Sequence, residues 1–78
     1  MRQKQNRLIF TFATTTMALK MESVCHANHA DGRLIPVPRE ITAGCGLAWC
    51  AMPESQRDLC EQMEREAITA QGLFFVML

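Results

Sequence analysis

The sequence has no excess charge of either sign and no long apolar run. Eight Lys and Arg residues balance eight Asp and Glu residues. Because proteins that bind nucleic acid usually carry a surplus of basic residues, this balance argues against a nucleic-acid partner. The longest apolar run is far shorter than the ~20 residues that a membrane-spanning helix needs. We therefore expect neither nucleic acid nor a membrane among the partners.

The chain is too short for a deep active site built from many residues. A domain of 78 residues hides only about 60–65% of the surface that its unfolded chain exposes. Residues 1–6 are polar and predict a disordered N-terminal tail. Residues 7–78 predict a single folded domain, with room for one reactive loop on a compact support.

The cysteines indicate the compartment in which the chain works. Four are present: Cys25, Cys45, Cys50 and Cys60. The apolar stretch Leu8–Ala13 follows basic residues as in a signal peptide, but threonines dilute it and no small-residue cleavage site follows. We therefore expect a cytoplasmic protein whose cysteines stay reduced. In a secreted chain, the alternative would be two disulfides.

Hydrophobic periodicity predicts four strands and two helices. The predicted order is a strand at 7–12, a helix from the threonines at 14–16 to about 28, strands at 33–38 and 47–52, a helix from 53 to about 70, and a strand at 73–78. This β-α-β-β-α-β order favours an α+β fold, a ferredoxin-like sandwich in which four antiparallel strands carry two helices on one face.

Two prolines indicate which strand lies at an edge of this sheet. Pro36 and Pro38 both lack the backbone N–H, and residues two apart in a strand point these groups to the same side. Ile35 and Val37 can still bond to a neighbour on the other side. This pattern is typical of an edge strand protected against pairing with another chain, and the second strand of a ferredoxin-like sheet is such an edge.

The first and last predicted strands are apolar on both faces. An antiparallel sheet with one wet face should alternate apolar and polar residues, and the strands at 7–12 and 73–78 do not. We therefore predict that the second sheet face is covered, most simply in a homodimer formed through this open face. The alternative is a small domain that tolerates exposed apolar residues.

The turn Gly44-Cys45-Gly46 is the candidate reactive loop. Glycine reaches backbone conformations with positive φ, and such turns can aim several N–H groups at one point and hold an anion. A guanidinium from Arg39 or Arg33 near the sulfur would favour the thiolate, which is the nucleophile. The alternative is that the glycines only serve a tight turn and that Cys45 is incidental.

A longer motif surrounds this turn. The run from Arg33 to Ala48, RLIPVPREITAGCGLA, resembles the signature of the selenium/sulfur carrier protein-like family of short bacterial proteins. The resemblance covers roughly residues 7–78. It implies a carrier that holds sulfur or selenium on Cys45 as a persulfide or selenopersulfide, with Arg39, Gly44 and Gly46 in the matching motif. It also implies a donor protein such as a cysteine desulfurase, an acceptor protein, no cofactor, and no turnover without these partners.

Cys50 departs from the expected motif and is open to two interpretations. It can act as a resolving cysteine that converts a Cys45 persulfide into a disulfide, or it can be a small apolar residue of a strand. A zinc site built from Cys25, His26 and His29 with Cys45 and Cys50 is possible by spacing alone, but it would cross a helix end, and we expect no metal. The function that competes with the carrier is a small dimerising binding or redox-sensing module that transfers no group.

Overall fold

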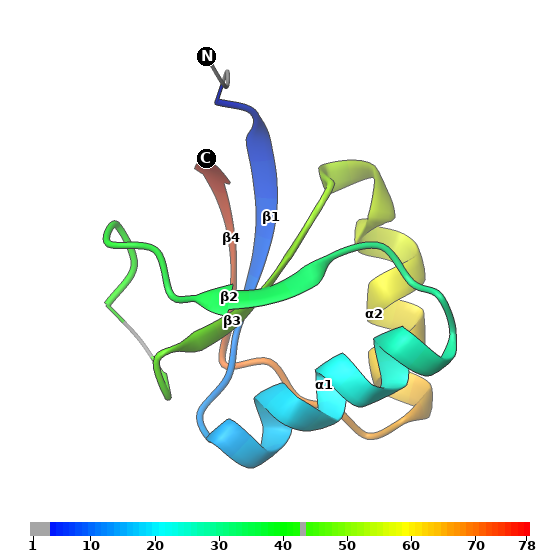
Figure 1. Ribbon diagram of the computed structural model, residues 1–78. Coiled ribbons are helices and arrows are strands. Elements are labelled where there is room, and N and C mark those ends of the chain that lie inside the picture. Colours follow the sequence, from blue (N-terminus) through cyan, green and yellow to red (C-terminus); the bar gives the residue numbers. More distant parts are fainter. Residues whose placement is uncertain (1–3, 43) are drawn as a thin grey trace.

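The computed structural model describes residues 4–42 and 44–78. Within them, four strands form one antiparallel sheet with the order β2-β3-β1-β4. Both helices lie on the same side of the sheet (Figure 1). The elements are β1 (Asn6–Thr11), α1 (Thr15–Ala27), β2 (Arg33–Pro36), β3 (Leu47–Ala51), the short 3₁₀ helix η1 (Pro53–Ser55), α2 (Gln56–Arg65) and β4 (Gly72–Met77). The predicted ferredoxin-like α+β fold is confirmed.

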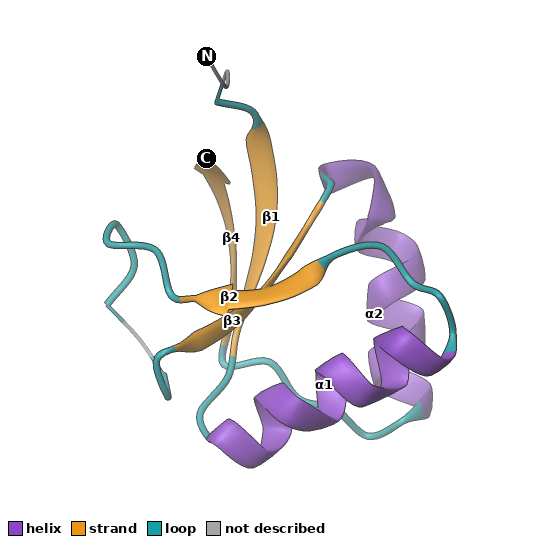
Figure 2. Cartoon of the chain, viewed as in Figure 1, coloured by secondary structure: helices purple, strands orange, loops and turns teal. Residues whose placement is uncertain are grey.

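Figure 2 shows the helices in purple on one side of the strands in orange, with the start of β1 extending beyond the helices. The main core lies where the layers overlap. Alternate residues of β1 point into it, because successive side chains of a strand face opposite sides. The fully buried members with the largest side chains on this side are Leu8, Phe10, Phe12, Met21 and Leu59.

The second helix is shorter than the sequence predicts. It ends at Arg65, and Ala67 adopts a left-handed conformation with φ +56°. The backbone N–H of Ile68 then donates to the carbonyl of Met63 at 2.9 Å, which satisfies a helix-end acceptor. This turn places Ile68 in the core at 5% exposure. The burial of Ile68 accompanies the early helix end.

The prediction that β2 lies at an edge is confirmed by the strand order. The N–H of Val37 donates to the carbonyl of Gly46 on the β3 side at 2.9 Å, so the positions of Pro36 and Pro38 face the open side. β2 itself ends at Pro36, two residues earlier than predicted. The chain then turns, with the N–H of Ile41 bonded to the carbonyl of Pro38 at 2.9 Å.

This turn changes the second face of the sheet. Ile41 packs with Ile9, Ala48 and Cys50 in a small buried cluster on the side away from the helices. Ile41 therefore covers part of the second face, for which the sequence predicted a cover, most simply a second copy of the chain. The apolar side chains that remain exposed are found mainly on β4.

Candidate functional site

The turn that holds Cys45 is anchored to the end of β1. The N–H of Cys45 donates to the carbonyl of Phe12 at 3.0 Å. Gly44 has φ +74°, and a Cβ added to it would overlap the Phe12 carbonyl oxygen and lie 3.0 Å from Oε1 of Gln71. Gly44 is therefore required by both conformation and space, because the turn sits directly on Phe12.

Gly46 has a different reason to be glycine. Its φ is +92°, but a Cβ placed on it would meet no other described residue within 4 Å. Only the backbone conformation favours glycine here. The space beside the turn is open on this side, so a partner can approach the backbone next to Cys45.

The Cys45 side chain lies between the core and solvent. It is partly buried and packs against the helix-side core. Its thiol donates weakly to the carbonyl of Leu47, with Sγ 3.8 Å from the oxygen. Cys25 and Cys50 are buried, whereas Cys60 is exposed on α2. Cys60 is thus the most exposed of the four cysteines, and Cys45 is the next.

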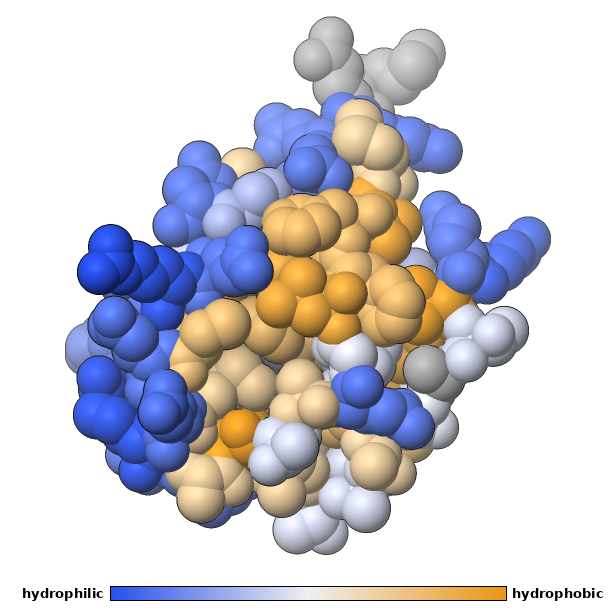
Figure 3. All heavy atoms as spheres, turned by 180° about the vertical axis from the view of Figure 1, so that it is seen from behind, coloured by the Kyte–Doolittle hydropathy of each residue, from blue (hydrophilic) through white to orange (hydrophobic). Residues whose placement is uncertain are grey.

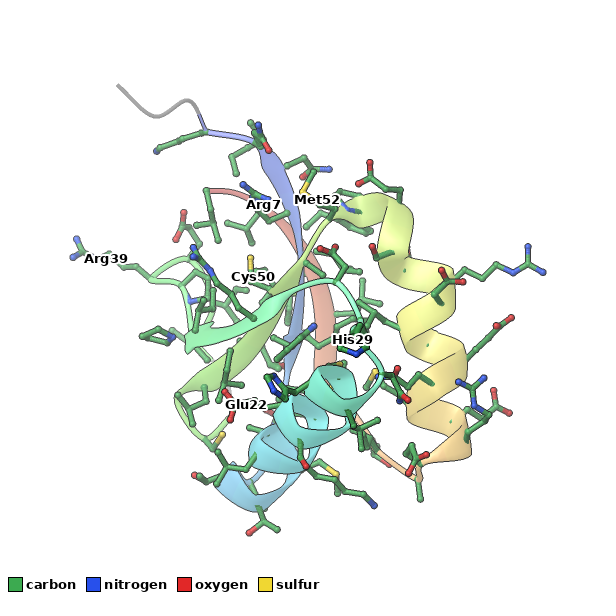
Figure 4. All side chains as sticks on the ribbon, turned by 45° about the vertical axis from the view of Figure 1, so that its right-hand side comes forward. Arg7, Glu22, His29, Arg39, Cys50 and Met52 are labelled. Carbon is green, nitrogen blue, oxygen red and sulfur yellow. The ribbon has the colours of Figure 1, made fainter. Side chains whose placement is uncertain are left out.

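The structure does not bring the two predicted arginines to Cys45. Arg39 is exposed beyond the end of β2 and points away from the domain (Figure 4). Arg33 lies opposite Cys50 in the β2–β3 register. Because the strands are antiparallel, the start of β2 lies beside the end of β3, roughly 10 Å or more from the turn that precedes β3. Among the described residues, no hydrogen bond joins either guanidinium to the Cys45 sulfur.

The backbone N–H of Cys45 also bonds to a different partner from the one that the sequence predicts. The sequence predicts that the N–H groups of the turn stabilise an anion at the sulfur, but the N–H of Cys45 is bonded to Phe12. Phe12 and Gln71 are the contacts that sequence reasoning missed. They come from opposite ends of the chain and meet the turn only through the sheet pairing, so no local signal could have identified them.

Cys50 lies in a separate hollow on the second face of the sheet. This hollow has a volume of about 690 Å³, and Arg7, Arg33 and Asp31 are among its lining residues. Arg7 donates to the sulfur of Met52 at 2.7 Å, and Figure 4 shows Arg7, Met52 and Cys50 at the same end of the sheet.

Cys45 and Cys50 pack in clusters on opposite sides of the sheet. The strand from Leu47 to Cys50 alone spans roughly 10 Å, whereas disulfide-bonded cysteines have Cα atoms within about 7 Å. A resolving reaction between the two thiols would therefore require β3 to open.

Cys25 is an inert thiol of the core. Burial raises its pKa, and a hydrogen bond from Gln62, with Nε2 3.2 Å from Sγ, opposes this rise. Gln62 is held in turn by Asn28, whose Nδ2 donates to its Oε1 at 3.2 Å. The thiol therefore stays protonated near neutral pH.

The geometry offers no ready-made metal centre. Across residues 4–42 and 44–78, no three His, Cys, Asp or Glu side chains gather as metal ligands. In the same part of the chain, no helix has the length and apolar character needed to cross a membrane.

The fold and the turn define a small ferredoxin-like domain that presents a partly buried thiol on a glycine-flanked turn. A family model described as "Putative Se/S carrier protein-like" matches residues 7–74, and the chain belongs to this family. The resemblance noted from the sequence is thereby confirmed. No curated protein and no solved structure matches the chain.

Proposed function

We propose that Cys45 carries a sulfur or selenium atom between a donor protein and an acceptor protein, as a persulfide or selenopersulfide. Two observations support this function. The family model spans the turn, and Cys45 is the thiol that this turn exposes beside an open approach at Gly46. The second observation carries the proposal, because a carrier atom must be reachable by two different proteins in succession.

The transfer requires no external oxidant or reductant. The Cys45 thiolate attacks the outer sulfur of a persulfide on the donor, the S–S bond of the donor breaks, and the donor thiolate leaves. The new bond is between the Cys45 sulfur and the transferred atom. In the second step a nucleophile of the acceptor attacks that outer atom, and the Cys45 thiolate leaves. Selenium follows the same two displacements.

The domain contributes position to this chemistry and leaves the electrostatic activation to its partner. The Phe12 hydrogen bond fixes the backbone of Cys45, and the open side at Gly46 admits the donor. Neither Arg33 nor Arg39 is hydrogen-bonded to the sulfur among the described residues. A cysteine desulfurase, as the donor, would then provide the cationic groups that favour the thiolate. A reducing cytoplasm would keep the thiol available.

Intact-mass analysis tests this function. The protein is incubated with a cysteine desulfurase and cysteine, and we expect a gain of one sulfur atom that is lost on reduction. Cys45→Ser should abolish the gain, whereas Cys60→Ser, which removes the other exposed thiol, should leave it unchanged. A Cys45→Ser protein that still gains the sulfur would reject the proposal and favour the dimerising or redox-sensing module.

A further inference from the structure

The edge strand β4 carries most of the exposed apolar surface. Among the described residues, five large apolar side chains are exposed, and four of them lie on this strand: Leu73, Phe74, Phe75 and Met77. Their exposed fractions are between 37% and 52%. Figure 3 shows the resulting apolar patch on the side of the molecule where β4 lies.

The backbone of β4 is half unpaired. Gln5 and Leu78 exchange two hydrogen bonds, with N···O distances of 2.8 and 3.0 Å. Because bonded and non-bonded pairs alternate along an antiparallel ladder, Val76 and Phe74 also face β1 with their N–H and C=O groups. The corresponding groups of Leu73, Phe75 and Met77 point outward, away from the sheet.

The two edges of the sheet are built in opposite ways. On the outer side of β2, Pro36 removes one donor, and Pro38, two residues after the strand ends, removes another; prolines at a sheet edge block pairing with another strand. The segment Gly72–Met77 has neither proline nor charge. A strand with outward donors and acceptors and an apolar surface is a template for another strand.

We propose that β4 pairs with β4 of a second copy of this chain, antiparallel about a two-fold axis at Phe75. The two sheets then become one continuous sheet. On the helix side Phe75 lies opposite its own copy and Leu73 lies opposite Met77 of the other copy. On the second face Phe74 lies opposite Val76. In this register all three outward residues of each strand pair, which gives about six hydrogen bonds between the copies.

The apolar surface of β4 is self-complementary, and for this reason we propose a second copy of the chain as its partner. Every cross-strand pair is apolar on both sides of the sheet, and aromatic and aliphatic pairs of this kind stabilise neighbouring strands. A two-fold interface needs a surface patch that complements itself, and this strand is centred on Phe75 with apolar residues on both sides. No charged side chain of the strand would be buried without a partner.

The exposed apolar side chains of β4 set an upper limit on the apolar area that the dimer can bury, and this limit indicates a weak dimer. The four exposed side chains offer roughly 350 Å² per copy, or about 700 Å² from both, before the strand backbone is counted. This is less than the roughly 1,000 Å² that a specific interface usually buries, so the backbone of the paired strands and the surface beside them must supply the rest. We expect a dissociation constant in the micromolar range, since ordering and association costs offset much of the gain.

The pairing of the two β4 strands leaves the Cys45 turn of each copy uncovered. The Cys45 turn lies next to Gln71, directly before β4 begins. Because the two β4 strands run in opposite directions, the two turns lie at opposite ends of the paired strands. The dimer therefore does not depend on the carrier function, and its test is independent of the sulfur transfer.

Sedimentation equilibrium tests the dimer with a matched pair of variants. Phe75→Lys should be monomeric at concentrations where the wild type dimerises, with at least a tenfold weaker association. The control is Leu19→Lys on α1, because Leu19 is 48% exposed and Phe75 is 50% exposed. It should dimerise as the wild type does. A wild-type chain that stays monomeric at several hundred micromolar would overturn the proposal.

Amide hydrogen exchange identifies the surface used. In the dilute monomer the N–H groups of Phe74 and Val76 should be protected and those of Leu73, Phe75 and Met77 should exchange quickly. Raising the concentration should protect the second set. Dimerisation without this change would mean that the sheets stack face to face, and the edge-pairing proposal would be wrong. Protection that needs another protein's strand would also reject the second copy as the occupant.

Discussion

Replacing Gly44 with alanine should destabilise the domain more than the same replacement at Gly46, two residues along the same turn. Both glycines have positive φ, where an L side chain costs about 1–2 kcal/mol. In the part of the chain that the structure describes, the new Cβ meets other atoms only at Gly44, namely the Phe12 carbonyl oxygen and Oε1 of Gln71. The two variants therefore separate the cost of conformation from the cost of lost space.

The additional cost at Gly44 follows from one hydrogen bond. The Phe12 oxygen that the Cβ would displace is also the acceptor for the N–H of Cys45. Weakening this bond costs about 0.5–1.5 kcal/mol, and the end of β1 must shift as well. We expect a total loss of about 2–4 kcal/mol for Gly44→Ala, compared with about 1–2 kcal/mol for Gly46→Ala.

Urea unfolding followed by tryptophan fluorescence measures both losses, because Trp49 is buried in the core. For a domain of this size, 1 kcal/mol lowers the Tm by roughly 4–8 °C, so a thermal scan gives an independent value. Equal losses at the two positions, or a larger loss at Gly46, would show that the turn is not anchored on Phe12.

Three further results are expected. Burial raises the pKa of Cys25, so the contribution of this thiol to stability is complete below the unfolded-state pKa of about 8.5 and is lost as pH rises through the folded-state pKa. The free energy of unfolding should therefore fall above a pH of about 8.5, and Cys25→Ala should make this fall less steep. An equally steep fall in Cys25→Ala would contradict the raised pKa of Cys25. The Asp31 carboxylate accepts two hydrogen bonds, at 2.8 and 2.9 Å, from the connection between β3 and α2, so Asp31→Ala should cost about 1–3 kcal/mol in urea unfolding, while Asp58→Ala on the exposed side of α2 should cost less. Mild oxidation followed by peptide mapping should give no disulfide between Cys45 and Cys50, and Cys50→Ser should not change the lifetime of a Cys45 persulfide. A Cys45–Cys50 disulfide that forms quickly in the folded protein would show that β3 opens readily.

The sequence was sufficient for the fold because its signals were local and agreed with one another. Apolar periodicity gave the order of strands and helices, and Pro36 and Pro38 indicated the edge position of β2 independently. The helix that ends at Arg65 was predicted too long, because the burial of Ile68 is a tertiary effect. The burial of Ile41 on the second face is likewise a tertiary effect, because it depends on contacts with Ile9 and Cys50 from two strands of the sheet.

The surroundings of the thiol could be predicted only in part. The glycine-flanked turn and its conformation follow from the residue types, and both φ values are positive. The position of Arg33 depends on the direction of the hairpin, which places it beside Cys50 and away from Cys45. An arginine that precedes a turn in the sequence therefore need not lie near the tip of that turn when a strand separates the two.

The contrast between the two edges would limit the proposed β4 pairing to two copies. If β2 and β4 could both accept another strand, each copy would pair at both edges and the chains would extend without limit. The prolines close one edge, so pairing through β4 alone ends at two copies. Replacing both Pro36 and Pro38 with threonine should then convert a concentration-limited dimer into larger assemblies, measurable by light scattering. In a Phe75→Lys background the same double replacement should give dimers at most, because only the β2 edge would then be open.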